Sequence, residues 1–222
     1  MPWMAPTPIG AWRVGAQLGE CPTWIPAANQ LAFVDGPACS YHLLDPASGA
    51  QTAVRLDRRI GSAAPFARGG AIVALAGGLA RIDAEGATHP LRSSVTDGIL
   101  FNDGKCDSRG RFWIGSRSSE GATGEGALFC LDVDGTVRRE AEGFDICNGM
   151  GWSPDGRSFY LIDTAPRIVC RYDFDPSRGL IGTRHVLHRF DGSRGKPDGM
   201  AIDACGRLYC AMWDGAGIAI LS

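Results

Sequence analysis

The chain contains 222 residues, with a net charge of −2 at pH 7 and a pI of about 6.1. This balance gives no reason to expect nucleic acid or an anionic membrane as a partner. The N-terminal segment MPWMAPTPIG does not resemble a signal peptide, and no apolar run is long enough to span a membrane, so we expect a soluble, cytoplasmic protein.

Short strands joined by tight turns account for the pattern along the chain. Glycine, at 31 residues, is more frequent than in average proteins, which favours many tight turns. The clearest unit covers residues 150–179, where Ile168 to Phe174 alternates apolar and polar side chains as a half-buried strand does. Comparable units begin near residues 20, 65, 102 and 198. The unit near residue 65 is the least distinct and has no polar residue at its front.

Repeats of this length predict the fold class. Units of roughly 40 to 50 residues built from short strands are typical of β-propeller blades. We therefore predict an all-β protein with a single propeller domain over residues 1–222. The fifth unit has room for only three strands before Ser222, and a ring of six blades needs roughly 240 to 300 residues. A six-bladed ring would thus lack its last blade or more.

The eight cysteines show neither a CxxC motif nor a paired metal-binding spacing. Cys130, Cys170 and Cys210 lie inside apolar, strand-like runs, where free thiols behave as small buried hydrophobes. We expect reduced, structural cysteines. Thiolate ligation by Cys21, Cys106 or Cys147 remains the alternative, because these three neighbour the candidate site described next.

Four polar residues stand at the fronts of the repeated units, directly before the first apolar run: Glu20, Asn102, Asn148 and Asp198. Their segments read GECPTW, FNDGKCD, CNGMGW and PDGMAI. In a propeller, equivalent positions of successive blades come together around one axis. We therefore expect these four oxygen-bearing side chains to meet near the axis, where they could form a cation site.

Asn-Gly and Asp-Gly pairs are above all turn signals, because both residues tolerate positive φ. Asp134-Gly135 and Asp155-Gly156 fall between two strands of one unit and are interpreted as such turns. Asn148-Gly149 and Asp198-Gly199 instead precede the first strand of a unit. A turn within a hairpin does not reach the axis, whereas a residue at the front of the innermost strand does. A β-turn remains the alternative for the second pair of motifs, and we favour ligand binding.

The residue types favour a hard cation. Two carboxylates and one or two amide oxygens suit Ca²⁺, Mg²⁺ or Mn²⁺. The four histidines form no cluster near these segments and no HExxH motif is present, which disfavours a closed zinc site. Neither a GxSxG motif nor a GxGxxG motif after a strand occurs, so serine-hydrolase and dinucleotide-binding functions are not supported.

Six segments, spread in order through almost the whole chain, carry a family resemblance. They are LGECPTW (18–24), FNDGKCDSRGRFWIGS (101–116), GALFCLD (126–132), NGMGWSPDGRSFYLIDT (148–164), YDFDPSRGLIGTR (172–184) and PDGMAIDACGRLYCAMW (197–213). Together they resemble the SMP-30/gluconolactonase/regucalcin-like family of six-bladed propellers.

The resemblance implies a metal-dependent hydrolase that opens a sugar lactone, such as a gluconolactone or arabinolactone, to the aldonic acid. It also implies that Glu20, Asn148 and Asp198 bind one divalent cation and that Asn102 lines the substrate pocket. The same oxygen set accepts several cations, so Ca, Mg, Mn, Zn and Fe(II) all stay open.

The chain departs from the family pattern on the substrate side. The family often has an arginine two residues before the position of Asn102, and Leu100 stands there in this chain. We assign Asp103 and Arg117 to substrate binding as well. Arg117, on the neighbouring expected strand, would supply a charge in place of the arginine.

Asp198 is the candidate general base, because a carboxylate beside the cation can also reach the attacking water. Asp163, which follows a strand in FYLID, either orients the site or ends the strand in a turn. The alternative to an enzyme is a propeller that binds Ca²⁺ in a regulatory or binding role without turnover. Leu100 and the missing blade favour that alternative more than the motifs alone do.

Overall fold

The computed structural model describes residues 3–4, 7, 10–66, 69–91 and 98–222. In this part of the chain every regular element is a β-strand, and the strands form five four-stranded antiparallel sheets. No helix among the described residues is long and apolar enough to cross a membrane. The predicted all-β propeller class is confirmed. The sequence suggested a six-bladed ring without its last blade, and the structure contains five sheets.

The first two sheets are formed by β2 (Gly19–Ile25), β3 (Gln30–Asp35), β4 (Ser40–Leu44) and β5 (Gln51–Arg55), then by β6 (Ile60–Pro65), β7 (Ala71–Leu75), β8 (Gly78–Ile82) and β9 (Thr88–Pro90). The third and fourth are formed by β10 (Ile99–Cys106), β11 (Phe112–Ser118), β12 (Gly126–Leu131) and β13 (Val137–Phe144), then by β14 (Cys147–Trp152), β15 (Ser158–Asp163), β16 (Ile168–Asp175) and β17 (Leu180–Arg189).

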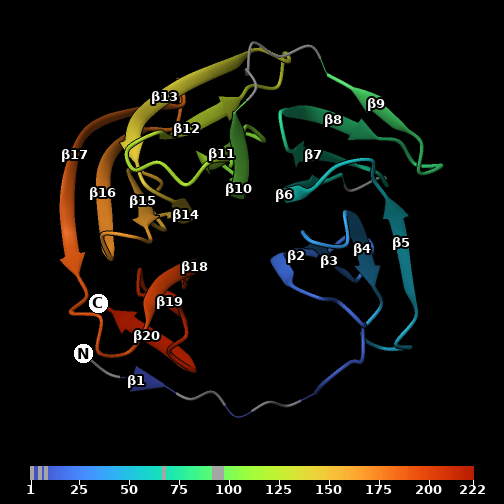
Figure 1. Ribbon diagram of the computed structural model, residues 1–222, viewed down its shortest axis with the longest axis horizontal. Helices are drawn as coiled ribbons and strands as arrows, with labels where there is room; N and C mark the ends of the chain where they lie inside the picture. Colours follow the sequence, from blue (N-terminus) through green and yellow to red (C-terminus); the bar gives the residue numbers. More distant parts are fainter. Residues whose placement is uncertain (1–2, 5–6, 8–9, 67–68, 92–97) are drawn as a thin grey trace.

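The fifth sheet joins the two ends of the chain. It contains β18 (Lys196–Ile202), β19 (Leu208–Trp213) and β20 (Gly217–Leu221), the three strands that the sequence predicted. Its fourth strand is β1 (Trp3–Met4), which pairs antiparallel with β20. Figure 1 shows β1 beside β20. Nothing in the local sequence of β1 indicates this pairing, because its partner lies at the far end of the chain.

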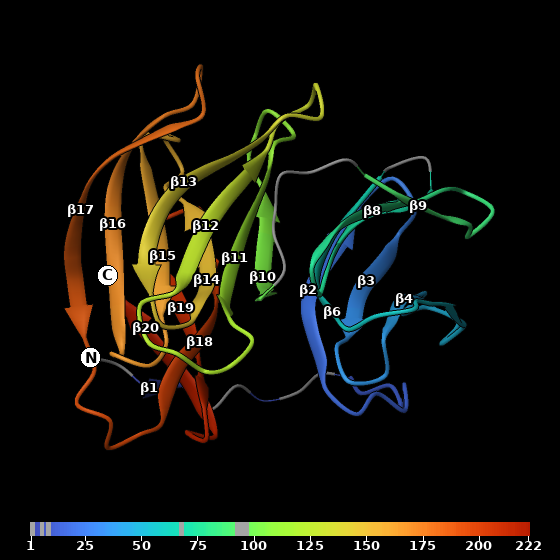
Figure 2. The same ribbon diagram turned by 45° about the horizontal axis from the view of Figure 1, so that its top comes forward.

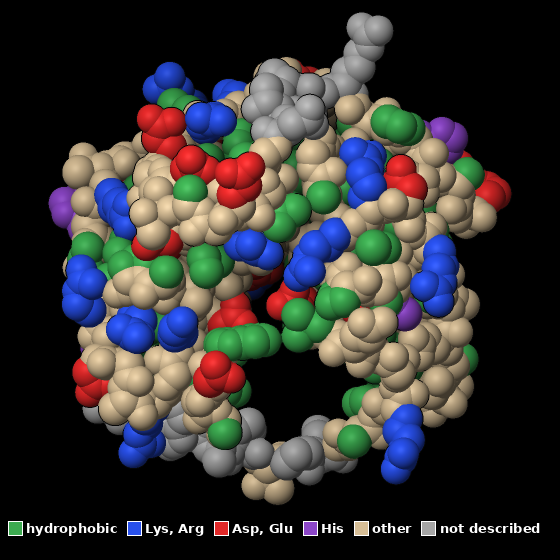
Figure 3. All heavy atoms as spheres, viewed as in Figure 1, with side chains coloured by type: hydrophobic (Ala, Val, Ile, Leu, Met, Phe, Trp, Pro, Cys, Tyr) green, Lys and Arg blue, Asp and Glu red, His purple; other side chains and the backbone are tan. Residues whose placement is uncertain are grey.

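The sheets stand around a central axis with β2, β6, β10, β14 and β18 innermost (Figures 1 and 2). Successive sheets therefore present the first strand of each unit to the axis, as a propeller requires. Between the first and the fifth sheets the same view in space-filling form shows an opening through the molecule (Figure 3).

Apolar side chains fill the interfaces between neighbouring sheets. The largest cluster lies between the third and fourth sheets around Trp113, which is 0% exposed. The ring of Trp113 packs against Phe159 and Phe174, with centroids 5.3 and 5.7 Å away. Burial of such large side chains supplies most of the driving force that holds one sheet against the next.

All eight cysteines are free thiols. Cys130, Cys170 and Cys210 are fully buried within these apolar layers, as the sequence predicted. They therefore serve as small core residues.

Candidate functional site

A β-bulge interrupts each innermost strand near its start. In β10, β14 and β18 the pairing with the following strand shifts, so that two residues on the inner strand face one on its partner. The bulged pairs are Asn102–Asp103, Asn148–Gly149 and Asp198–Gly199. A bulge redirects side chains away from the regular alternation of a strand and often lies next to a functional site. Three of the four residues identified in the sequence thus occupy one equivalent position.

Glu20 lies one position earlier than the other three. It still pairs with Val34, and the bulge in β2 falls on the next two residues, of which Cys21 has a φ of +51°. In β6 the shift falls at Gly61, which has no side chain to offer. The second sheet therefore contributes no polar group at its bulge, in agreement with the weak signal of that unit in the sequence.

The bulges also show that two of the glycine pairs are not hairpin turns. Asn148-Gly149 and Asp198-Gly199 lie inside strands β14 and β18. Gly135 and Gly156, in contrast, have φ values of +89° and +69° in the turns between strands. The interpretation of the first two pairs as something other than hairpin turns is confirmed.

Gly149 allows the fourth and fifth sheets to approach closely at this point. A Cβ atom at residue 149 would lie 2.5 Å from the carbonyl oxygen of Asp198 and 2.6 Å from the backbone nitrogen of Met200. Real side chains do not come so near to backbone atoms, so only glycine fits here. The close approach brings the side chains of Asn148 and Asp198 together.

Asn148 connects three groups of the candidate site. Its side chain is 8% exposed, and its Nδ2 donates a hydrogen bond to Oδ1 of Asp198 and another, 3.1 Å long, to Oγ1 of Thr164. The hydrogen bond to Asp198 joins two residues that are 50 positions apart in sequence. Thr164 was not recognised in the sequence, although it ends the NGMGWSPDGRSFYLIDT segment.

Glu20 and Asp198 belong to one electrostatic cluster. Burial raises the pKa of Glu20, the negative charge of Asp198 raises it further, and the charges of Arg59 and Arg117 lower it. Burial also raises the pKa of Asp198, while the hydrogen bond from Asn148 lowers it. Two carboxylates that repel each other in a partly buried place are stabilised by a cation between them.

The residues present therefore fit a hard divalent cation. The predicted set offers two carboxylates and one amide oxygen, which are ligands of the kind that Ca²⁺ and Mg²⁺ take. Within the described residues, no group of three or more His, Cys, Asp or Glu side chains is arranged to hold a metal. The candidate set needs the amide of Asn148 and would be completed by water or substrate.

Asn102 bridges the third and fourth sheets. Its Nδ2 donates a 3.2 Å hydrogen bond to the carbonyl oxygen of Cys147, the residue directly before Asn148. Asp103, the second residue of the same bulge, accepts a hydrogen bond from the backbone of Gly104. Burial raises the pKa of Asp103, and the charge of Lys105 lowers it. The carboxylate of Asp103 in turn raises the pKa of Glu20, so it lies within electrostatic range of the cluster.

Arg117 lies on β11 directly opposite Leu100 of β10. It also forms an isolated bridge to Ile146, just before β14. The register therefore puts Arg117 next to Leu100. Arg59, which precedes β6, lowers the pKa of Glu20, as Arg117 does. It was not identified in the sequence, because it stands one residue before the apolar run of an indistinct unit.

Asp163 holds the segment that leads into β14. Its Oδ1 accepts hydrogen bonds from the backbone nitrogens of Ile146 and Asp145, at 3.0 and 3.2 Å. Asp35 does the same for the first sheet, where it accepts from Gln17 and Leu18 ahead of Glu20. Asp163 thus ends its strand and also fixes the approach to Asn148.

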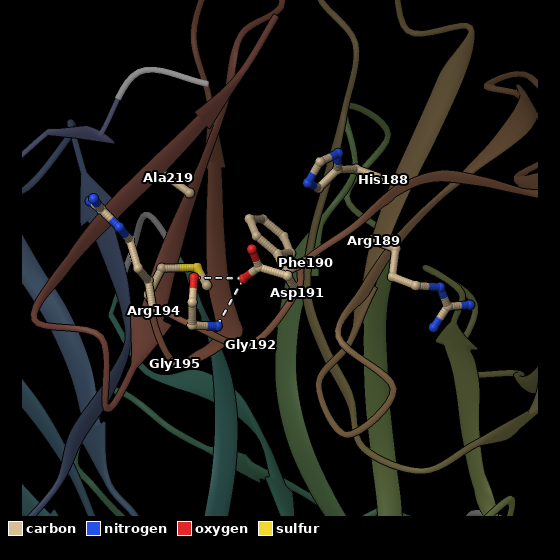
Figure 4. Close-up of a pocket in the computed structure, with 10 residues that line it drawn as sticks. His188, Arg189, Phe190, Asp191, Gly192, Arg194, Gly195 and Ala219 are labelled. Atoms are coloured by element: carbon tan, nitrogen blue, oxygen red, sulfur yellow. Dashed lines mark hydrogen bonds between the residues drawn. The ribbon is translucent and has the colours of Figure 1, made fainter.

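Two cavities lie outside this cluster. One, of about 370 Å³, is lined by the loop from His188 to Gly195 together with Met212 and Ala219 (Figure 4). In it Asp191 accepts two hydrogen bonds from Ser193, which fix the loop. The other, of about 410 Å³, is lined by residues 22–27, 63–65 and 105–106 at the opposite ends of the inner strands. The candidate site is therefore defined by the bulges and their charges.

Comparison with known proteins finds relatives that are similar over almost the whole chain. Residues 18–222 match the family model described as the SMP-30/Gluconolactonase/LRE-like region. The 6-deoxy-6-sulfogluconolactonase of Pseudomonas putida is 34% identical over 214 residues, covering 95% of this chain and 73% of its own length. The pentonolactonase XacC of Haloferax volcanii is 34% identical over 201 residues, covering 90% and 68%. Regucalcin of Sus scrofa is 31% identical over 214 residues, covering 93% and 72%.

Solved structures agree with these relatives. A luciferin-regenerating enzyme superposes with a TM-score of 0.87 at 28% identity, over 93% of this chain and 73% of its own. Regucalcin from Agrobacterium tumefaciens, described as a calcium-binding protein, superposes with a TM-score of 0.83 at 29% identity, over 92% and 74%. The chain thus spans roughly seven tenths of the length of these relatives.

Proposed function

The chain belongs to the SMP-30/gluconolactonase/LRE-like family, and on that premise we propose that it is a metal-dependent hydrolase that opens a sugar lactone to the aldonic acid. Relatives named as lactonases for a pentonolactone and for a sulfogluconolactone support hydrolysis of this bond type. The observation that carries the proposal is the hydrogen bond between Asn148 and Asp198, which joins two bulges of neighbouring sheets beside the carboxylate of Glu20.

In this proposal Glu20, Asn148 and Asp198 hold one divalent cation through their side-chain oxygens. When bound, such a cation polarises the lactone carbonyl and stabilises the negative charge that develops on its oxygen. Burial and mutual repulsion destabilise the charged forms of Glu20 and Asp198, and a bound cation would offset this cost.

Asp198 is the proposed general base. Its carboxylate stands beside the cation that it helps to hold, and from there it can also reach the attacking water. It would take a proton from the water that attacks the carbonyl carbon, and the proton would pass to the ring oxygen as the carbon–oxygen bond of the lactone breaks. The hydrogen bond from Asn148 orients the carboxylate for this step.

Asn102, Asp103 and Arg117 are proposed to bind the sugar. One N–H of Asn102 Nδ2 donates to the carbonyl oxygen of Cys147, which leaves the side-chain oxygen and the second N–H of Asn102 for a sugar hydroxyl. Arg117, half-buried opposite Leu100, would contact the polar substituents of the ring.

We further propose that the five sheets are blades of a six-bladed ring, in one domain over residues 1–222. The opening between the first and fifth sheets lies where a sixth blade would stand. The site residues come from the first, third, fourth and fifth sheets, so the cluster itself does not need the sixth.

The proposal is tested with protein that has been treated with a chelator. It is stripped of cations, then supplied separately with Ca²⁺, Mg²⁺, Mn²⁺, Zn²⁺ or Fe²⁺, and acid release from five- and six-membered aldonolactones is followed with a pH indicator. At least one cation should restore turnover above the spontaneous rate. A regulatory cation-binding propeller, favoured by the relative described as a calcium-binding protein, would bind Ca²⁺ tightly and show no turnover with any lactone.

A further inference from the structure

Two arginines stand at the same end of the inner strands as the bulges. Arg59 directly precedes β6, and its backbone is fixed by a 2.8 Å hydrogen bond from Ala76 to its carbonyl oxygen. Its guanidinium lies beside the turn after β3, where a Cβ at Gly36 would be 3.5 Å from its Nη2. Arg117 comes from the third sheet and donates a weak 3.4 Å hydrogen bond to the carbonyl oxygen of Ser118. The two side chains thus approach the cluster from different sheets.

Neither guanidinium forms an ion pair with a carboxylate within the described part of the chain. The segments that carry them come close together: a Cβ at Gly61, two residues after Arg59, would lie 2.1 Å from the carbonyl oxygen of Phe101, and Arg117 pairs with Leu100, directly before Phe101. In having no ion pair among the described residues, the two differ from most other arginines near carboxylates in the molecule, such as Arg111, which is paired with Asp107 at 2.6 Å. The arginines at the site therefore retain their hydrogen-bonding capacity for a ligand.

The balance of charge at the site also favours an anionic ligand. Glu20, Asp103 and Asp198 supply three negative charges, and a bound divalent cation together with Lys105 neutralises them. The charges of Arg59 and Arg117 then remain without compensation. An excess of positive charge in a partly enclosed site attracts anionic substrates and favours their binding.

We propose that Arg59 and Arg117 form a subsite for an acidic substituent of the lactone, so that the preferred substrates are aldonolactones bearing a phosphate, sulfonate or carboxylate group away from the ring carbonyl. This inference rests on the proposed function and specifies its substrate class. Guanidinium groups suit such oxyanions because their donors match two oxygens at once.

The test compares two lactones that differ in charge. The ratio of kcat/KM for 6-phospho-D-glucono-δ-lactone to that for D-glucono-δ-lactone is measured for the wild type, for Arg59→Gln, for Arg117→Gln and for the double variant. We expect the wild type to prefer the phosphorylated lactone, and each substitution to lower that ratio about tenfold, the effect of losing one hydrogen bond to a charged group. Added salt should reduce the preference of the wild type for the phosphorylated lactone.

Arg58→Gln is the matched control. Arg58 neighbours Arg59 in the chain, but its guanidinium is engaged with Asp57 and with the carbonyl oxygen of Ala76. It should leave the ratio unchanged. A wild-type ratio near one, or a ratio that the double variant does not alter, would overturn the subsite while the lactonase activity stands.

Binding of 6-phospho-D-gluconate, the product of the phosphorylated lactone, tests the subsite without turnover. If no lactone is hydrolysed, the proposed function fails, and calorimetry still decides the subsite. Binding that the double variant weakens supports it, and absent or unaltered binding overturns it.

Discussion

The ammonium group of Lys105 lies 2.9 Å from the carbonyl oxygen of Met200 and donates a hydrogen bond from the third sheet to the fifth. Met200 is the first residue of β18 that pairs again after the Asp198–Gly199 bulge. This contact therefore fixes the strand that carries the candidate base, by means of a residue 95 positions earlier in the chain. Lys105 is a positioning residue in this account, because it acts on the site through the backbone.

Replacing Lys105 with Met should remove this link while preserving most of the apolar stem. We expect a loss of about 1–3 kcal/mol in the free energy of unfolding, since a carbonyl loses its charged donor. A fall in kcat larger than any change in KM should accompany it, because Asp198 loses its fixed position. Lys196→Met is the control, since Lys196 is exposed at the start of β18. Equal kcat in the wild type and in Lys105→Met would argue against the positioning role, and Lys105→Arg should restore part of the activity.

Gly149→Ala tests the close approach of the fourth and fifth sheets. The added methyl group would meet backbone atoms of Asp198 and Met200, so the strands must move apart, at an expected cost of about 1–3 kcal/mol. Gly199→Ala is a matched control from the adjoining bulge, because a Cβ there meets no atom within 4 Å and its φ lies outside the left-handed region. Urea denaturation of the two variants should give a lower midpoint for Gly149→Ala only. Equal midpoints would show that the two sheets can separate freely.

His42 should make the folded protein less stable as the pH falls below neutral. It is 8% exposed, its ring nitrogens are 2.8 Å from Ser40 Oγ and from Gln51 Nε2, and burial lowers its pKa from 6.5. The unfolded chain therefore binds a proton at this position more readily than the folded chain does. The contribution of the neutral ring to stability is complete above pH 6.5 and is lost as the pH falls towards the folded pKa.

The free energy of unfolding of the wild type and of His42→Gln, compared from pH 7.5 to 5, isolates this effect. The difference between the two proteins should shrink as the pH falls. A difference that is constant over the whole range would contradict a lowered pKa at His42.

Cation binding should stabilise the folded protein. A ligand that binds only the folded state adds about 2.7 kcal/mol when it is present at a hundred times its Kd. We expect the midpoint temperature of unfolding of the cation-free protein to rise when a suitable divalent cation is added. This rise should disappear in Glu20→Gln. Glu85→Gln, an exposed change in a turn, should keep the shift. A full shift in Glu20→Gln would remove Glu20 from the ligand set.

The sequence predicted the propeller class and the positions of the five units, because alternation and turn chemistry repeat along the chain. It also placed Asn102, Asn148 and Asp198 at equivalent points, since each stands at the front of its unit. The offset of Glu20 could not be predicted, because a bulge depends on the pairing of two strands.

The other features that the sequence did not predict depend on contacts between distant parts of the chain. Lys105 binds a carbonyl oxygen two sheets away, and the hydrogen bond between Thr164 and Asn148 joins the end of one strand to the start of another. Neither contact leaves a local pattern. The pairing of β1 with β20 is of the same kind, since it joins the first and last strands.

The most direct test of the central claim is the turnover of an aldonolactone by Asp198→Asn with saturating cation. The substitution keeps the size and the hydrogen-bonding shape of the side chain but removes its capacity to accept a proton. Loss of a general base should lower kcat by about 10²–10⁴-fold, whereas Asp203→Asn, half-buried in the turn between β18 and β19, should retain full activity. Unchanged turnover in Asp198→Asn would contradict the assignment of Asp198 as the base.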